Sequence, residues 1–213
     1  MSKSYALTEY ESKNLLSSYG LRTTRELLVY SVDEAIEKSS TLGFPVVLKA
    51  SGEEFLHKSD LGGVKLSLDN EDSVRNAARV LDAEFGFPLL LSEQVESSRE
   101  FIAGVARSSE YGLVLAFGVG GVFAEIIQDV IFRLLPASKQ TVRSMFDELS
   151  HRDLLGQVRG EKEIDLEQLT EALISIGECA MDRQDIISID VNPLLIDDGM
   201  PIAVDALVEL YEQ

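Results

Sequence analysis

The amino-acid sequence predicts an α+β fold of two lobes, residues 1–95 and 96–213. Segments with helical spacing of apolar residues are mixed with strand-like runs, but the two do not alternate as in a doubly wound parallel sheet. The pattern changes near residues 93–96, where an apolar run ends in polar residues. With 213 residues and 45% hydrophobic content, the chain is able to bury a real core. The junction of two lobes is a common place for a ligand.

In the first lobe, caps and periodicity predict the helices. The pattern T-x-x-E at residues 8–11 and the pattern S-x-x-E at 31–34 are capping boxes that open helices, and a glycine follows each helix. Val74, Ala77, Ala78 and Leu81 have the spacing of one helix face. The remaining elements expected in this lobe are a strand between the first two helices, the strand "PVVLKA", its hairpin partner or neighbour "GVKLSL", and a strand over 88–95.

In the second lobe, strands are expected to outnumber helices. The runs "EFIAGVAR" and "YGLVLAFG" predict two strands joined by a short polar turn. Apolar spacing predicts one helix around 142–149, and Asp165 caps a longer helix that ends near residue 182. The segment "VFAEII" alternates like a strand, and "IISIDVNPLLIDDGMPIAVDA" reads as two strands around a tight turn.

Composition excludes several classes of protein. A formal net charge of −18 repels phosphate backbones, so we expect no nucleic-acid partner. The longest uncharged run, residues 111–124, is too short and too glycine-rich to cross a bilayer, so we expect no membrane association. The one cysteine, Cys179, lies in a helical pattern and is expected to be a buried thiol. The N-terminal residues do not resemble a signal peptide, and the expected location is the cytoplasm.

Two residues of the first lobe are candidates for chemistry. Lys49 ends an apolar strand on the same face as Val47, and its ammonium is either solvated or directed at an anion. His57 lies in the polar run "SGEEFLHKSDLGG" and is either a surface histidine or a nucleophile. Imidazole is neutral and nucleophilic near pH 7, which suits it to accept a phosphoryl group. The glycines at 62–63 then serve as a hinge for a travelling loop.

The segment "LVLAFGVGGVFAEII" places Gly118, Gly120 and Gly121 after a strand. Such glycines permit a close backbone approach to a ligand, or simply form a turn. A dinucleotide fingerprint is not completed, because Phe123 stands where the third glycine belongs. The segment therefore indicates either a glycine-rich turn or a loop over phosphates.

The C-terminal hairpin carries a candidate metal site. Asp-Gly at 198–199 is a strong two-residue turn, and that turn places Asn192 directly opposite Asp205. Cβ atoms of such a pair lie roughly 4.5–5.5 Å apart. An amide oxygen and a carboxylate at this separation suit Mg²⁺ bridging to phosphates, whereas the alternative is a polar hairpin face in water.

Together these segments resemble the ATP-grasp fold, and in particular the β subunit of ADP-forming acyl-CoA synthetases of the acetyl-CoA type, relatives of succinyl-CoA synthetase β. Matching segments include "LTEYESKNLLSSYGL", "FPVVLKASGEEFLHKSDLGGVKLSL" and "SIDVNPLLI", in family order over nearly the whole chain. The resemblance implies two α+β lobes with ATP or ADP and Mg²⁺ between them. It also implies the reversible reaction of ATP, a carboxylic acid and CoA to ADP, phosphate and acyl-CoA, with acyl-phosphate and phosphohistidine intermediates.

The resemblance also assigns roles by position. Lys49 matches the phosphate-binding lysine, Glu100 matches the acid on the ribose hydroxyls, and His57 matches a histidine that relays phosphate. Asn192 and Asp205 match the Mg²⁺ ligands. Further positions match the hinge whose backbone reads adenine, at Glu93, Gln94 and Val95, and the glycine segment that ends in the acid Glu125.

The resemblance implies a partner, and three rival functions remain. The partner is a CoA-binding α subunit, through which the carboxylate and CoA enter a hetero-oligomer. The first rival is a non-catalytic ATP-grasp regulatory module that works with an acyltransferase or CoA-binding partner. Lys49, His57, Asn192 and Asp205 all stand at their positions and favour activity. The second rival is an ATP-grasp ligase that uses no CoA, and the third is a dinucleotide-binding protein.

Overall fold

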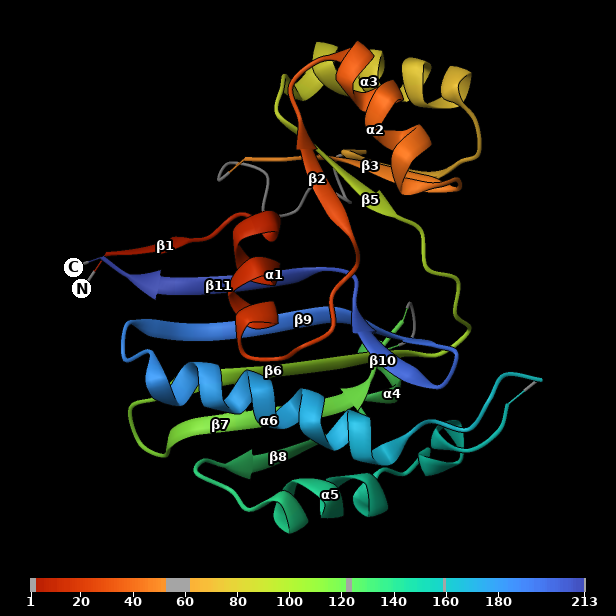
Figure 1. Ribbon diagram of the computed structural model, residues 1–213. Coiled ribbons are helices and arrows are strands. Elements are labelled where there is room, and N and C mark those ends of the chain that lie inside the picture. Colours follow the sequence, from red (N-terminus) through yellow and green to blue (C-terminus); the bar gives the residue numbers. More distant parts are fainter. Residues whose placement is uncertain (1–2, 53–61, 122–123, 159, 213) are drawn as a thin grey trace. The chain divides into compact units, whose positions relative to one another are not determined.

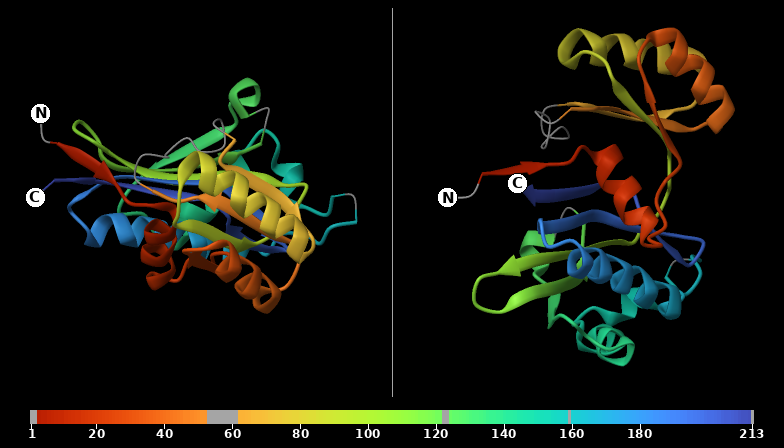
Figure 2. Two further views of the ribbon diagram at one scale, coloured as in Figure 1. Left: turned by 90° about the horizontal axis from the view of Figure 1, so that it is seen from above. Right: turned by 60° about the vertical axis from the view of Figure 1, so that its left-hand side comes forward.

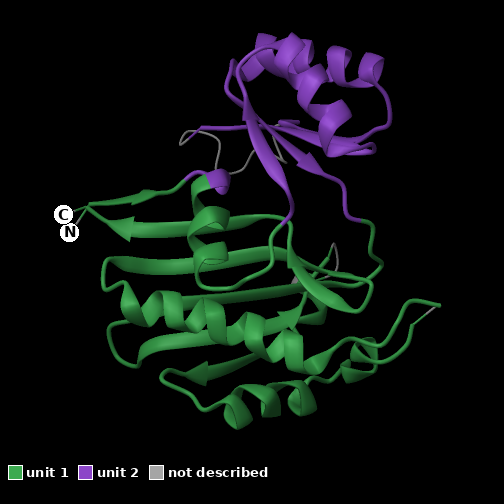
Figure 3. Ribbon diagram, in the orientation of Figure 1, with its two compact units in different colours: residues 1–7, 11–23, 96–213 green, residues 8–10, 24–95 purple. Residues whose placement is uncertain are grey.

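The computed structural model describes residues 3–52, 62–121, 124–158 and 160–212 (Figure 1). The chain forms two compact units (Figure 3). Unit 1 comprises residues 1–7, 11–23 and 96–213, and unit 2 comprises residues 8–10 and 24–95. The change after residue 95 coincides with the expected lobe junction, but most of the first 23 residues group with the C-terminal part of the chain. The reason is that the N-terminal strand pairs with the last strand of the sequence.

Unit 2 is a four-stranded antiparallel sheet with two helices on one face (Figure 1). The strands follow the order β2-β5-β3-β4. Their bounds are β2 Glu26–Val29, β3 Val46–Ala50, β4 Val64–Leu68 and β5 Leu89–Glu93, and the helices are α2 Val32–Leu42 and α3 Glu71–Phe85.

Local sequence signals explain the two helices of unit 2. The Ser31 hydroxyl accepts a hydrogen bond from the Glu34 N–H at 3.1 Å and opens α2, as the capping pattern predicts. The face of α3 that the periodicity predicts is buried, with Val74, Ala78 and Leu81 fully inaccessible. It packs with Val46 and Leu48 of β3 in one apolar core. The opposite face of β3 therefore carries Val47 and Lys49.

Unit 1 is built on a seven-stranded antiparallel sheet in the order β1-β11-β9-β6-β7-β8, with β10 paired to β9. β1 and β11 lie side by side in both views (Figures 1 and 2). The strand bounds are β1 Ser4–Ala6, β6 Glu100–Ser108, β7 Gly112–Val119, β8 Val130–Leu134, β9 Ile186–Asp197, β10 Met200–Ala203 and β11 Ala206–Tyr211. The helices are α1 Glu9–Ser18, which belongs to this unit from residue 11 on, α4 Ala124–Ile127, α5 Lys139–Glu148 and α6 Leu166–Asp182, with a 3-10 turn at Arg152–Leu155.

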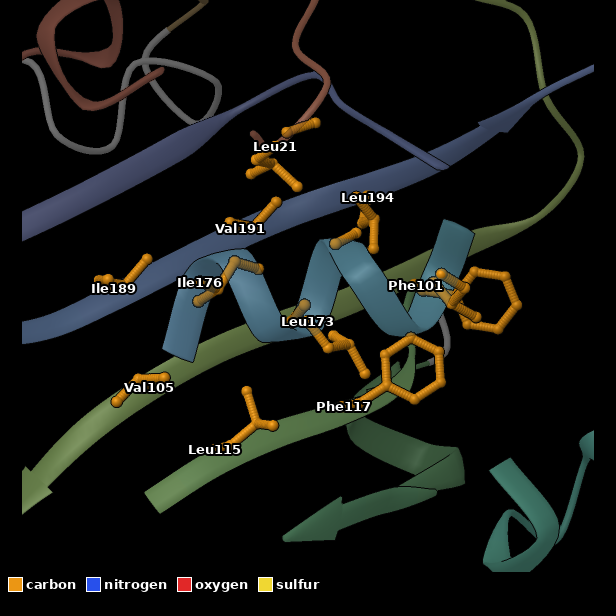
Figure 4. Packing of buried hydrophobic residues seen from close by; sticks show 14 of the residues in the cluster. Leu21, Phe101, Val105, Leu115, Phe117, Leu173, Ile176, Ile189, Val191 and Leu194 are labelled. Carbon is orange, nitrogen blue, oxygen red and sulfur yellow. The ribbon is translucent and has the colours of Figure 1, made fainter. Parts of the chain in front are cut away.

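The core of unit 1 lies between this sheet and the helices α5 and α6 (Figure 4). Asp165 caps α6 as expected, because its carboxylate accepts the Glu167 and Gln168 N–H groups. The rings of Phe101 and Phe117 stack with centroids 5.3 Å apart. Cys179 is fully buried, and this burial raises the pKa of its thiol to about 11. The expected buried thiol is confirmed.

Two features differ from the sequence expectations. The strand predicted for "VFAEII" is wrong, because Ala124–Ile127 forms the single helical turn α4. Alternation over so few apolar residues does not distinguish a strand from a helical turn. The sequence predicts neither β1 nor β11, because each is short and its pairing joins residues near opposite ends of the sequence. In the parts of the chain that the structure describes, every helix falls short of the length or apolar character that crossing a membrane requires.

We predict that Phe117→Ala destabilises unit 1 by about 3–5 kcal/mol, because the ring is fully buried and contacts two other phenylalanines. Denaturant unfolding followed by circular dichroism measures the loss. Phe132→Ala is the matched control: that ring is 60% exposed, and the expected change is within about 0.5 kcal/mol. Equal losses from both substitutions would contradict this description of the core.

Candidate functional site

The C-terminal hairpin has the register that its turn predicts. Asp198 and Gly199 both have positive φ, +52° and +88°, as a type I′ turn requires. Asp197 pairs with Met200, and the same register continues beyond the hairpin, where Val191 pairs with Ala206. Between these pairs the Asn192 N–H donates to the Asp205 carbonyl at 3.2 Å. The position of Asn192 opposite Asp205 is confirmed, and their role as metal ligands stays a prediction.

These two residues lie on the open face of the unit 1 sheet, opposite the helices. Ile189 and Val191 of β9 point into the core with Val208 of β11. Strand alternation therefore turns Ser188, Asp190 and Asn192 to the other face. A shallow hollow of about 210 Å³ on this face is lined by Gly104, Ala116, Phe132 and Asp190, among others.

The electrostatics of this face favour a cation. Partial desolvation, and then the negative charge of Asp205, raise the pKa of the Asp190 carboxyl above its ordinary value. The two carboxylates thus act on one another. Among the described residues no group of three or more His, Cys, Asp or Glu side chains forms a metal cluster. An amide oxygen and carboxylates suit Mg²⁺ nevertheless, because Mg²⁺ takes few protein ligands and keeps water and phosphate oxygens.

A second feature of unit 1 is a cavity at the start of β6. Its volume is about 240 Å³, and its lining includes Ser98, Arg99, Glu100, Gly120, Gly121, Ile127 and Leu154. The Gly120 N–H donates to the Glu100 carbonyl at 2.7 Å, which ties the glycine segment to the strand that carries Glu100. The structure therefore brings together Glu100 and two of the three predicted glycines.

Different constraints require glycine at different positions of this segment. A Cβ on Gly118 would lie 2.5 Å from the Asp129 carbonyl oxygen, so close packing of β7 against the next segment requires this glycine. Gly121 has a φ of +83°, and a Cβ there would lie 3.6 Å from Oε2 of Glu100. Gly121 is thus required by its backbone conformation rather than by lack of space, and it lies beside the Glu100 carboxylate.

Lys49 is buried in unit 2. Its side chain is 5% exposed, and its Nζ lies 2.6 Å from Oε1 of Glu9, whose side chain is 4% exposed. The strand places Lys49 on the face opposite the α2 and α3 core, as the alternation predicts. A solvated edge charge, one of the two interpretations of the sequence, is excluded by this burial. Binding of phosphate by Lys49 stays a prediction.

The predicted hinge residues are partly committed to other contacts. The Glu93 carboxylate accepts the Arg25 N–H at 2.8 Å and pairs with the Arg25 guanidinium at 2.7 Å. The Glu93 N–H donates to the Arg25 carbonyl, and the Gln94 N–H donates to the Pro45 carbonyl. The role of Glu93, Gln94 and Val95 as the hinge that reads adenine stays a prediction.

Two predicted residues cannot be placed. His57 lies outside the described residues. Glu125 belongs to α4, but its side chain is not described. Both assignments stay predictions.

Three buried charged residues beside the site were missed by the sequence analysis. Lys13 of α1 donates to the Val204 carbonyl, next to Asp205. Arg99 donates to Glu161 and to the carbonyls of residues 154, 156 and 162, and so fixes that segment against the Glu100 cavity. Asp129 accepts the Ser150 and His151 N–H groups. In the sequence, each of the three appears as a charged residue within a helix or turn, and such a residue is usually exposed, so its burial could not be predicted.

The chain has two units, and each is an antiparallel sheet with helices on one face. A glycine segment lies beside an acid, and a hairpin carries a polar pair. This combination is typical of the ATP-grasp class. The sequence matches the ATP-grasp domain family over residues 1–210, and the chain belongs to that family.

Within the family the chain is similar to acetate–CoA ligases. It is 34% identical over 209 residues to the ADP-forming acetate–CoA ligase I subunit beta of Pyrococcus furiosus, covering 94% of this chain and 90% of that protein. It is 35% identical over 208 residues to the ADP-forming acetate–CoA ligase II of Archaeoglobus fulgidus, covering 97% of this chain but 31% of that protein. The chain thus spans nearly all of the first relative and about a third of the second.

A solved structure of an acetyl-coenzyme A synthetase is similar to this chain as well. The acetyl-coenzyme A synthetase 1 of Ca. Korarchaeum cryptofilum, in complex with coenzyme A and Mg-AMPPCP, matches with a TM-score of 0.85 and 37% identity. The match covers 97% of this chain and 93% of that chain. In that structure a phosphohistidine segment points towards the nucleotide binding site. The resemblance inferred from the sequence is confirmed.

We predict that Asp129→Asn destabilises the chain at neutral pH by about 1–3 kcal/mol, because Asn accepts fewer hydrogen bonds at a site that is 6% exposed. Burial alone raises the pKa of Asp129, but the N–H groups of Ser150 and His151 outweigh it, and the pKa is lowered from 3.8. A lowered pKa gives stability that is present above pH 3.8 and lost as pH falls through the folded value.

Thermal unfolding at a series of pH values measures this effect. The gap between wild type and Asp129→Asn should be full at neutral pH and should close in acid. Asp82→Asn, an exposed carboxylate on α3, controls for loss of a surface charge. A gap that stays constant down to acid pH would contradict the assignment.

Proposed function

We propose that this chain is the nucleotide-binding subunit of an ADP-forming acyl-CoA synthetase. The reaction is ATP, a carboxylic acid and CoA to ADP, phosphate and acyl-CoA, and it is reversible. The register of the C-terminal hairpin supports this best, since it holds Asn192 opposite Asp205 on the open sheet face. The similarity to beta subunits of acetate–CoA ligases over nearly their whole length supports the same function.

Each unit contributes its own share of nucleotide binding. In unit 2, the buried ammonium of Lys49 binds phosphate, and the main chain of Glu93, Gln94 and Val95 meets the base. The Lys49 ammonium pairs with Glu9 at 2.6 Å, and because burial leaves its charge little screened by salt, it attracts a phosphate oxygen as well. In unit 1, Glu100 accepts hydrogen bonds from the ribose hydroxyls beside Gly121. Asn192 and Asp205 hold Mg²⁺, which neutralises phosphate charge when bound.

The chemistry that remains is phosphoryl transfer, and His57 carries it. The neutral imidazole accepts a phosphoryl group from a phosphohistidine of a partner subunit, forming one N–P bond as another breaks. It then passes the group to ADP, and this N–P bond breaks as an O–P bond to the β-phosphate forms. The partner is a CoA-binding α subunit, which binds the carboxylate and CoA. The location in the cytoplasm stays a prediction.

Asp205→Asn tests the metal site directly. The substitution keeps the shape and removes the charge, so the Mg²⁺ concentration needed for half-maximal ADP binding should rise about tenfold or more. Titration calorimetry over a series of Mg²⁺ concentrations measures it. The control is Asp198→Asn in the turn of the same hairpin, whose carboxylate lies 2.7 Å from Lys162 Nζ. An unchanged Mg²⁺ requirement in Asp205→Asn would rule out Asp205 as a ligand.

His57→Asn separates binding from transfer. The variant should bind MgADP with nearly wild-type affinity and form no ATP when mixed with a phosphorylated α subunit. The wild-type chain alone should bind MgATP and make no acyl-CoA until that partner is added. ATP formation by the variant at the wild-type rate would refute the relay, and acyl-CoA made by the isolated chain would refute the need for a partner.

A further inference from the structure

The side chains of α1 reach the backbone of the segment that carries Asp205. β1 pairs with β11 only as far as Ala6, and the Leu7 N–H makes the last bond, to the Val208 carbonyl. Beyond that point α1 lies beside this edge of the sheet (Figure 1). Ser12 Oγ accepts the Val208 N–H at 3.1 Å, and Lys13 Nζ donates to the Val204 carbonyl at 3.0 Å. Two side chains thus replace the missing strand partner.

Lys13 is an unusual residue for this task. It is 1% exposed, and lysine is almost never fully buried unless its charge is compensated. An apolar side chain of similar length fills such a place without the cost of desolvating an ammonium. What an apolar side chain lacks is a donor for the Val204 carbonyl and a positive charge. The ammonium supplies both, one residue from Asp205.

The main chain of residues 204–205 is held by hydrogen bonds from two sides, from Lys13 and from β9. Toward β9, the Val204 N–H donates to the Pro193 carbonyl at 3.1 Å, and the Asn192 N–H donates to the Asp205 carbonyl. The bond from Lys13 therefore closes a chain of contacts around residues 204–205.

We propose that Lys13 is a positioning residue for the metal pair: its ammonium holds the Val204–Asp205 main chain so that the Asp205 carboxylate stays opposite Asn192. This inference rests on the proposed function, because it makes Lys13 necessary for Mg²⁺-dependent nucleotide binding without contact to the nucleotide. Ser12 provides an internal comparison, since it makes a similar bond from the same helix but to Val208, away from the metal pair.

The test compares Lys13→Met with Ser12→Ala in the full chain by two measurements. The first is amide hydrogen exchange without ligand. Lys13→Met should speed exchange at Val204 and Asn192 about tenfold or more, the lower end for loss of a charge-assisted hydrogen bond. Ser12→Ala should speed exchange at Val208 only. The second is the Mg²⁺ concentration for half-maximal ADP binding, which should rise about tenfold in Lys13→Met and stay unchanged in Ser12→Ala.

Lys13→Arg and Lys13→Gln keep the inference falsifiable. Arginine keeps the charge and the donor and should restore part of the Mg²⁺ response, while glutamine keeps a donor without the charge and should restore less. If Lys13→Met does not fold, the difference between these two variants decides the question. Wild-type exchange and Mg²⁺ response in a folded Lys13→Met would overturn the proposal, as would an equal Mg²⁺ effect from Ser12→Ala.

The two measurements distinguish a failure of the proposed function from a failure of the role of Lys13. If the wild-type chain binds no magnesium nucleotide, the proposed function and the metal role of Lys13 fall together. The exchange rates at Val204 and Asn192 still decide whether Lys13 holds this segment, because they need no ligand.

Discussion

One antiparallel register runs along β9 from Ser188 to Asp197, first against β11 and then against β10. Side chains alternate between the faces of a strand, so a slip of one residue would exchange the core face and the open face. Ile189 and Val191 are in the core with Val208, and their burial opposes such a slip. The same burial holds Asn192 and Asp205 together on the open face. A hydrophobic constraint on one side of the sheet therefore sets the polar geometry on the other.

Those parts of the fold that depend on neighbours in the sequence could be predicted. The cap at Ser31, the buried face of α3 and the Asp198–Gly199 turn each follow from residues a few positions apart. The pairing of Asn192 with Asp205 followed as well, because a two-residue turn fixes the register of its strands.

What could not be predicted depends on distant residues. The pairing of β1 with β11, the ion pair of Lys49 with Glu9, and the contacts of Arg99 with the 154–162 segment join residues far apart in the chain. No periodicity or spacing encodes such partners. Sequence alone placed Lys49 on the correct face of its strand but left its burial open, and it gave Lys13 and Arg99 no role.

Three cationic side chains are buried in this acidic chain. Lys13, Lys49 and Arg99 are all buried in a protein with a net charge of −18. The excess of carboxylates repels anions at long range, but salt screens exposed charges over about 10 Å. A buried ammonium is screened much less. Each of the three lies against its own oxygen partner: Lys13 against the Val204 carbonyl, Lys49 against Glu9 and Arg99 against Glu161. Buried cations therefore fix local structure in this acidic chain.

The pairing of β1 with β11 has a consequence for how the chain is made on the ribosome. Unit 2 is almost one continuous segment, residues 24–95, set within the sequence of unit 1. Its sheet and both its helices are complete when Glu93 has emerged, long before β11 is synthesised. Unit 1 must wait, because its edge strand at residues 4–6 has no partner until residues 209–211 arrive. During translation β1 therefore remains an unpaired strand, and a chaperone that binds exposed extended segments would meet it there.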